Sequence, residues 1–177
     1  MPRKNEAETL LLSGQTVYKD DERLEVCGTL DEISSLLGVV KTFLKGKNDE
    51  LFDPLTEIQR HLFVLGAEIS GLEAKREVPK LGEDALKFLE ELEKKYDEKL
   101  PRLRNFIFPG GCKAAAFLHL ARAVVRRGER KAIRLSRRFQ VDPLVISYLN
   151  KLSKVLFILA RYANFREGMA EDLWVRS

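Results

Sequence analysis

Residues 106–130 read FIFPGGCKAAAFLHLARAVVRRGER, and this stretch decides the fold because it contains both a turn and a long helical run. Pro109, Gly110 and Gly111 are a turn signal, and a run rich in Ala, Leu and Arg follows them. Apolar residues recur through the run at helical spacing. The stretch therefore predicts an amphipathic helix that begins just after the glycines.

The arginines of this helix form a stripe. Arg122, Arg126 and Arg130 recur every fourth residue, so successive side chains drift by only about 40° around the helix and share one face. Glu129 lies on the same side. Two interpretations stay open. The stripe is either a solvated basic face in which Glu129 forms an intrahelical ion pair, or a row of guanidinium groups that binds a polyphosphate or an acidic partner.

The rest of the chain also has helical periodicity. Apolar residues step by three and four through further segments, in stripes that are typical of packed helices. The sequence therefore predicts an all-α protein, an antiparallel five-helix bundle, with no strand. The stripes contain Leu30, Ile33, Leu37, Val40 and Leu44; Leu51, Leu55, Ile58, Leu62, Leu65, Ile69 and Leu72; Leu86, Leu89, Leu92 and Tyr96; Phe117, Leu118, Ala121, Val124, Val125, Ile133 and Leu135; and Val145, Leu149, Leu152, Leu156 and Leu159.

Breaks in the periodicity mark the ends of the helices. Asp142-Pro143 is an N-cap followed by proline at the first helical position. Thr29–Glu32 fits a capping box, whereas Glu25-Val26 fits a helix that has already begun. We expect residues 1–22 to form an N-terminal arm and residues 23–177 to form one helical domain. The other breaks are Gly46–Asp49, residues 73–82, Pro101 and Pro109–Gly111.

The bulk composition indicates a globular protein. The chain has 177 residues, of which 45% are hydrophobic and 33% charged, which suits one domain with a real core. No apolar run approaches the roughly 20 residues of a membrane span, and the polar N-terminus does not resemble a signal peptide. Cys27 and Cys112 stand outside any metal-ligand spacing. We expect reduced thiols, a cytoplasmic location and no contact with a membrane.

The net charge of +4 conceals an uneven distribution. Residues 122–138 contain eight Lys or Arg and one acid, which predicts a local basic surface. One hypothesis is a helical module that binds RNA or DNA through this surface. The segment lacks interleaved exposed aromatics and any known nucleic-acid motif, so we expect no nucleic-acid partner.

Other polar residues allow two interpretations each. Asp31 is either an acid of an early helical turn that faces water, or the partner of an arginine from another subunit. Asn150 interrupts an apolar helix and is either a surface residue or a buried amide that needs a partner. His61 and His119 are isolated, which favours packing over metal ligation.

Three blocks of the sequence, taken together, carry a specific resemblance. They are KDDERLEVCGTLDEISSLLG at 19–38, NFIFPGG at 105–111 with LHLARAVVRRGER at 118–130, and YLNKLSKVLFILAR at 148–161; the closing Leu173-Trp174 also fits. From about residue 7 to its end, the chain resembles the PduO-type ATP:cob(I)alamin adenosyltransferases.

The resemblance implies a homotrimer with active sites between subunits. It implies transfer of the 5′-deoxyadenosyl group of ATP to the cobalt of cob(I)alamin, with release of triphosphate. Cob(I)alamin is itself the nucleophile, so the protein must position the reactants, neutralise the leaving triphosphate with arginine, lysine and Mg²⁺, and exclude water. No protein side chain is assigned to a metal. A reductase or a cobalamin-dependent enzyme is the further partner that the resemblance suggests.

The resemblance also assigns roles to individual residues. Arg126 matches the arginine that contacts the triphosphate, and Asp31 with Arg122 matches a salt bridge across subunits. Phe106 matches the aromatic residue that packs on the lower side of the corrin and disfavours an axial ligand. The catalytic residues it implies are Arg126, Glu129 and Arg130, and the ATP-binding residues are Thr9, Lys19, Arg126, Glu129, Arg130 and Asn150.

The N-terminal arm departs from the family pattern. The family has Thr-Gly-Asp-x-Gly-x-Thr, a loop that holds the ATP phosphates with backbone amides. Here Arg3, Lys4, Asn5 and Ala7 stand at the first, second, third and fifth positions, and only Thr9 is kept. The alternative function is therefore that of a non-catalytic paralogue, a trimeric helical protein that binds cobalamin or a nucleotide.

Overall fold

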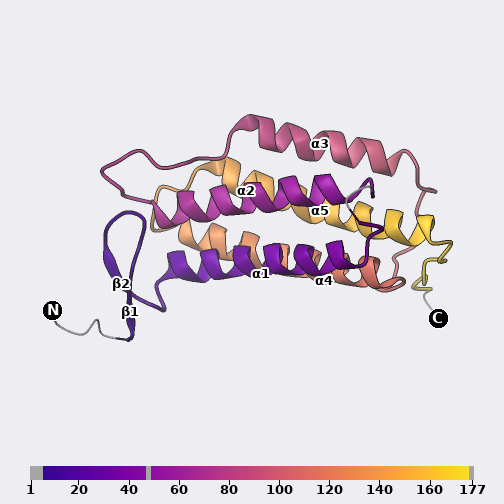
Figure 1. The fold of residues 1–177 in the computed structure, drawn as a ribbon, viewed down its shortest axis with the longest axis horizontal. Coiled ribbons are helices and arrows are strands. Elements are labelled where there is room, and N and C mark those ends of the chain that lie inside the picture. Colours follow the sequence, from indigo (N-terminus) through magenta and orange to yellow (C-terminus); the bar gives the residue numbers. More distant parts are fainter. Residues whose placement is uncertain (1–5, 47–48, 176–177) are drawn as a thin grey trace.

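The computed structural model describes residues 6–46 and 49–175. Within these ranges the chain forms five helices and one short hairpin (Figure 1). The five predicted helices are therefore confirmed, whereas the expectation of no strand is wrong. The elements are β1 (Glu8–Leu10), β2 (Thr16–Tyr18), α1 (Glu22–Thr42), α2 (Phe52–Ser70), α3 (Glu83–Asp97), α4 (Lys113–Leu135) and α5 (Pro143–Arg166).

Successive helices run in opposite directions along one long axis (Figure 1). Helix α1 packs against α2 and α4, and α5 packs against α4 and α3. The helices α1, α2, α4 and α5 thus form the bundle, and α3 lies on its outside. The β-hairpin and the C-terminal tail lie at opposite ends of the molecule (Figure 1).

The predicted apolar stripes form the core of the bundle. Ile33, Leu37 and Leu118 are among the side chains with no exposed surface. Helix α5 is long and apolar enough to cross a membrane, with a mean hydropathy of 1.4 over its most apolar window. Because 56% of that window is buried inside the bundle, α5 is accounted for as a core helix.

The region predicted to be an N-terminal arm contains the β-hairpin. β1 and β2 are antiparallel, with Thr9 opposite Val17, and Gly14 has a φ of +87° in the turn between them. The turn docks on the end of α2, where the backbone N–H of Leu12 donates to Ser70 Oγ at 3.0 Å. Strands of three residues are too short to show a readable alternation, which is why the sequence did not reveal them.

The N-cap of α1 decides between the two interpretations of where this helix begins. Asp21 is the N-cap, and its side chain accepts a hydrogen bond from the N–H of Arg23 at 2.9 Å. Thr29 therefore lies inside the helix, where its hydroxyl donates to the carbonyl of Glu25. The capping box at Thr29–Glu32 is wrong, because these residues lie inside α1, where the backbone N–H groups are already bonded to carbonyls of the preceding turn.

Gly128 allows α4 to approach α1 closely. A Cβ at this position would lie 3.3 Å from Cγ2 of Thr29 and 3.7 Å from Cδ1 of Ile33. Glycine inside a helix costs roughly 1 kcal/mol relative to alanine. Here the missing side chain makes room for Thr29, so the residue serves the contact between the two helices.

Asn164 of α5 holds the turn that starts α4. Its Oδ1 accepts from the N–H of Cys112 at 2.9 Å, and its Nδ2 donates to the carbonyl of Gly110 at 3.0 Å. Gly111 between them has a φ of +103°, and a Cβ there would lie 2.0 Å from Asn164 Oδ1. The predicted Pro-Gly-Gly turn thus needs a buried amide from the last helix to set its shape.

The Asn164→Ala substitution should lower the free energy of unfolding by about 1–3 kcal/mol, because a partly buried N–H and a partly buried carbonyl lose their partner. Urea unfolding followed by circular dichroism measures the change. Asn105→Ala is the control, since Asn105 is exposed in the same connection and should change stability by less than about 0.5 kcal/mol. Equal stabilities of the two variants would contradict this role of Asn164.

Candidate functional site

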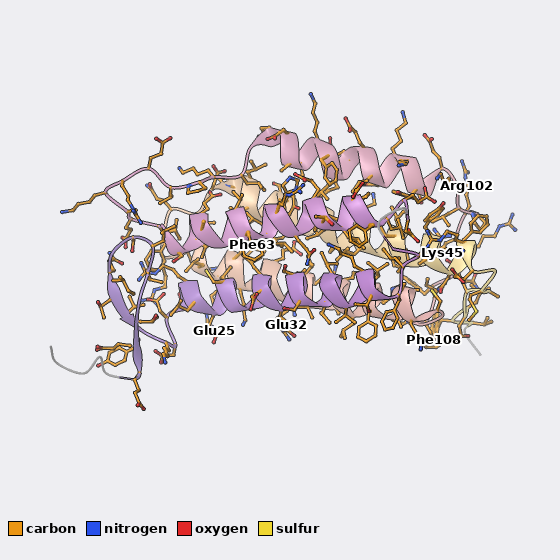
Figure 2. All side chains as sticks on the ribbon, viewed as in Figure 1. Glu25, Glu32, Lys45, Phe63, Arg102 and Phe108 are labelled. Carbon is orange, nitrogen blue, oxygen red and sulfur yellow. The ribbon has the colours of Figure 1, made fainter. Side chains whose placement is uncertain are left out.

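Helix α4 is tied to α1 by a row of ion pairs, here called the α1–α4 ladder. Its acids lie along α1, and Figure 2 shows two of them, Glu25 and Glu32, on the same side of that helix. Each pair is partly exposed and adds little to stability, but together the pairs occupy one set of basic side chains. The ladder consists of Glu32 with Arg127, Glu25 with Lys131 at 2.6 Å, and Glu22 with Arg134 at 3.6 Å and with Arg138 at 3.4 Å.

The arginines of the predicted stripe do not take part in the α1–α4 ladder. Among the described residues, no acid forms an ion pair with Arg122, Arg126 or Arg130. Arg126 and Arg130 are exposed, and Arg122 is half-buried. The basic surface predicted from the sequence is therefore divided into two faces, and only one of them retains guanidinium groups that are available to an anion.

Glu129 lies among these arginines but is held from α5. Asn150 Nδ2 donates to Glu129 Oε1 at 2.9 Å. No ion pair to Arg126 or Arg130 joins Glu129 in the part of the chain that the structure describes. The intrahelical ion pair considered from the sequence is thus absent there, and Asn150 is a surface residue with a polar partner.

Arg122 lies over the partly buried ring of Phe157. Its guanidinium is 5.9 Å from the Phe157 ring, and its Nε is buried with no hydrogen-bond partner among the described residues. Burial and the neighbouring charge of Arg126 lower the pKa of Arg122. An anion placed beside Arg122 would relieve both effects.

Asp31 does not meet Arg122 within one chain. It is exposed on α1 and forms no ion pair in residues 6–46 and 49–175. It borders an apolar groove of about 280 Å³ between α1 and α2, where Leu30 and Leu62 form the floor and Phe63 stands at the rim with 72% of its surface exposed. Figure 2 shows Phe63 on α2.

The residues predicted to bind ATP from the arm lie on the hairpin. Thr9 is half-buried in β1, and Lys19 is exposed just after β2, with its N–H donating to the carbonyl of Ala7 at 2.8 Å. No hydrogen bond or ion pair connects either side chain to the arginine stripe in the described structure. Arg3, Lys4 and Asn5, which replace the first three residues of the family loop, lie outside the described residues.

Phe106 lies at the opposite end of the molecule from the hairpin. It is 80% exposed, and its ring is 6.3 Å from that of Trp174 in an edge-on arrangement. The C-terminal tail pairs with this segment, because the N–H of Trp174 donates to the carbonyl of Phe106 and Ile107 pairs with Leu173. Phe108, labelled at the same end in Figure 2, is also exposed.

Thus one chain brings together only part of the predicted site. Arg122, Arg126, Glu129 and Arg130 share α4, and Asn150 joins them from α5. Thr9, Lys19, Asp31 and Phe106 lie elsewhere on the surface. A hollow of about 860 Å³ between residues 71–80 and 138–140 is lined by none of these residues.

Sequence reasoning missed the pairing that selects the free arginines. The signal was present, because Glu25 and Glu32 are seven residues apart and so share one face of α1. The sequence did not reveal that this face of α1 meets α4, since periodicity does not say which helix a face contacts.

No group of three or more His, Cys, Asp or Glu in the described ranges is placed to hold a metal ion.

Comparisons with known proteins point to one family. The family model for cobalamin adenosyltransferase matches residues 2–163. The chain is 36% identical over 175 residues to a corrinoid adenosyltransferase of Bacillus subtilis, covering 98% of this chain and 90% of that protein. It is 35% identical over 170 residues to the corrinoid adenosyltransferase MMAB of Homo sapiens, covering 93% of this chain and 68% of that protein.

Solved structures agree with the sequence relatives. A variant PduO-type ATP:corrinoid adenosyltransferase from Lactobacillus reuteri, complexed with cobalamin and ATP, superimposes with a TM-score of 0.89 at 32% identity. The match covers 96% of this chain and 95% of that one. Another variant of the Lactobacillus reuteri protein, complexed with ATP, gives the same TM-score at 33% identity and covers 96% and 95% of the two chains.

The buried imidazole beside Arg122 should make the fold sensitive to acid. His119 is 3% exposed, neither ring nitrogen has a partner among the described residues, and burial together with the charge of Arg122 lowers its pKa to about 4. The unfolded chain has a histidine pKa of about 6.5. The contribution of His119 is therefore complete above pH 6.5 and is lost as the pH falls to 4, by about 3 kcal/mol in total.

In His119→Leu this part of the pH dependence should disappear, because no titrating group remains at the site. Urea unfolding of both proteins at several pH values between 7.5 and 4.5 measures the difference in free energy. A variant whose stability falls with pH as steeply as that of the parent protein would show that His119 is not responsible.

Proposed function

Because this chain belongs to the cobalamin adenosyltransferase family, we propose that its α4 arginines form the triphosphate wall of an active site completed by a second subunit. The protein is a corrinoid adenosyltransferase, and it transfers the 5′-deoxyadenosyl group of ATP to cob(I)alamin. The observation that carries the proposed site is the division of basic residues on α4. The ladder neutralises one face, and Arg126 and Arg130 are left available on the other.

The reaction requires little covalent chemistry from the protein. The cobalt of cob(I)alamin attacks C5′ of ATP, the cobalt–carbon bond forms, and the C5′–oxygen bond breaks as triphosphate leaves. Negative charge grows on the leaving group, so fixed guanidinium groups next to it lower the barrier. Arg126 and Arg130 are one turn apart on a rigid helix, a spacing that suits a chain of phosphates.

Glu129 and Asn150 position the nucleotide in this proposal. Their hydrogen bond fixes the carboxylate beside the exposed arginines of α4, where it can also accept from a sugar or a base. Mg²⁺ binds mainly through substrate phosphates and water and needs only one or two carboxylates. Glu129 fits such a contribution. When bound, the ion would neutralise the charge of the triphosphate.

The hairpin brings Thr9 and Lys19 to the nucleotide from a neighbouring subunit. In the described structure neither side chain forms a hydrogen bond or ion pair with the stripe of its own chain, which is consistent with a site shared between chains. Phe106, exposed at the far end of α4, would face the corrin and disfavour an axial ligand below the cobalt. The adenosyl group would be transferred in the space between Phe106 and the triphosphate wall.

A homotrimer would supply partners for polar groups that have none within one described chain. Asp31 borders an apolar groove, and Arg122 has a buried Nε without a partner in its own described chain. If Asp31 of one subunit meets Arg122 of the next, each interface joins two different faces, and three copies close a ring. Phe63 would be covered in the same contact.

The cellular setting follows from the thiols and the substrate. Cys27 and Cys112 are free, and burial raises the pKa of Cys27 to about 11, which keeps it protonated. We place the enzyme in the cytoplasm. Because cob(I)alamin must be produced by reduction, a reductase is the partner that the chemistry requires, and a cobalamin-dependent enzyme is the natural recipient of the product.

Arg126→Ala should lower the rate of adenosyl transfer by about 10²–10³-fold, because a charged donor to the leaving group is lost. The assay follows the cob(I)alamin spectrum with ATP and Mg²⁺ under anaerobic reduction. Arg137→Ala is the matched control, since Arg137 is exposed just beyond α4. A rate for Arg126→Ala within threefold of the control would contradict the proposed role of Arg126 in stabilising the leaving triphosphate.

Asp31→Arg should convert the trimer to monomers at micromolar concentration, because it places an arginine opposite Arg122. Sedimentation velocity gives the oligomeric state. Glu25→Ala is the control on the same helix, because Glu25 is paired with Lys131 of its own chain and its loss should leave the assembly intact. An Asp31→Arg protein that still sediments as a trimer would rule out the pair.

A further inference from the structure

Arg23 is a buried arginine at which several loops meet. Its side chain is 4% exposed. Nε and Nη2 donate to the two carboxylate oxygens of Asp21, each at 2.9 Å, and Nη1 donates to Gln15 Oε1 at 2.7 Å. The planar group also lies 4.9 Å from the centre of the Phe139 ring. One guanidinium thus connects the hairpin turn, the N-cap of α1 and the connection between α4 and α5.

A third loop closes the same cluster. Glu73, which follows α2, lies 3.7 Å from Arg23 Nη1 and accepts from Gln15 Nε2 at 3.4 Å. Its φ is +64°, in the left-handed region that a glutamate adopts at a cost of about 1–2 kcal/mol. The surrounding contacts must hold this conformation. Gln15, Arg23 and Glu73 therefore form a closed triangle at the turn of the hairpin.

The remaining attachments of the hairpin are few. Leu11 is buried, and the N–H groups of Leu12 and Ser13 donate to Ser70 at 3.0 and 3.1 Å. Arg76 donates to the carbonyl of Leu12 at 3.3 Å from an exposed position. These contacts hold the tip of the hairpin. The side chain of Gln15 adds a contact at the last residue of the turn, directly before β2, and Arg23 is its buried partner.

We propose that Arg23 is a positioning residue for adenosyl transfer: through Gln15 it fixes the direction in which the hairpin presents Thr9 and Lys19 to ATP. This inference rests on the proposed function for the role of Thr9 and Lys19, but the hold on the hairpin stands on its own contacts. Arg23 reaches the nucleotide only through the hairpin and acts on ATP binding. Within the described residues, its side chain contacts Asp21, Gln15, Glu73 and Phe139, which lie at the hairpin end of the bundle.

Buried charge explains why the contact is rigid. A desolvated guanidinium that forms hydrogen bonds on all sides has few alternative geometries. The hydrogen bond from Arg23 lowers the pKa of Asp21, so the carboxylate that anchors Arg23 stays ionised across the working range. Gln15 contributes a neutral amide oxygen, so the arm can be detached by a mild change that leaves the buried ion pair in place.

The test uses the full-length protein with the variants Gln15→Ala, Arg23→Met and Arg23→Met combined with Gln15→Ala. Arg166→Met is the matched control, because Arg166 forms an ion pair with an aspartate, the buried Asp49, at 2.8 Å at the other end of the bundle. Hydrogen–deuterium exchange of residues 8–19, relative to the core of α5, reports on the hairpin without any substrate. Steady-state kinetics with ATP and cob(I)alamin varied in turn report on function.

We expect exchange of residues 8–19 to rise about tenfold in Gln15→Ala and in Arg23→Met, with no further rise in the double variant, because each substitution removes the same Arg23–Gln15 hydrogen bond to the hairpin. The KM for ATP should rise by a similar factor, whereas the KM for cob(I)alamin stays constant. Arg166→Met should change neither the relative exchange nor the KM for ATP.

Unchanged exchange in Gln15→Ala and Arg23→Met would overturn the proposal, as would equal effects on both KM values or an identical response in Arg166→Met. If the parent protein itself transfers no adenosyl group, the proposed function fails. In that case the exchange measurement still decides whether Arg23 holds the hairpin, so the two failures are distinguishable.

Discussion

The close contact between α1 and α4 is the constraint on which the rest of the structure depends. Gly128 lets Thr29 approach the backbone of α4, and the ladder of acids and bases runs along the same contact. Apolar burial supplies the energy of the bundle, because exposed ion pairs contribute little. The buried apolar stripe of α4 sets the rotation of the helix about its axis, and the ladder pairs the basic residues that this rotation turns toward α1.

This rotation makes α4 both a structural and a functional helix. Of its basic residues from Arg122 onward, one set is neutralised by α1, and another is left on an open face beside Glu129 and Asn150. The helix also sets a distance, because about 20 Å of helix separate Arg126 from the first turn after the glycines. The corrin end and the phosphate end of the proposed site are therefore spaced by one rigid element.

Buried polar side chains set the connections that the apolar core leaves free. Asn164 shapes the Gly110–Cys112 turn, and Arg23 draws the hairpin, the α1 cap and two loops together. Each satisfies backbone or charged groups that would otherwise be costly to bury. A core of Leu, Ile and Val packs helices in many ways, whereas such hydrogen-bonded side chains accept one arrangement. Asn164 lies beside the turn that leads into α4, and Arg23 lies beside the hairpin, and both segments belong to the proposed site.

The sequence by itself determined the five helices, because apolar residues at spacings of three and four share one face of a helix and would not share one face of a strand. It also determined the family resemblance, through blocks around Asp31, Arg126 and Asn150, and the position of the arginine stripe. The sequence did not predict the hairpin, because strands of three residues are too short to show a period. Only the tertiary structure decided which arginines stay unpaired and which helix Glu25 and Glu32 meet, because partners across a bundle are set by rotation and packing and not by spacing along the chain.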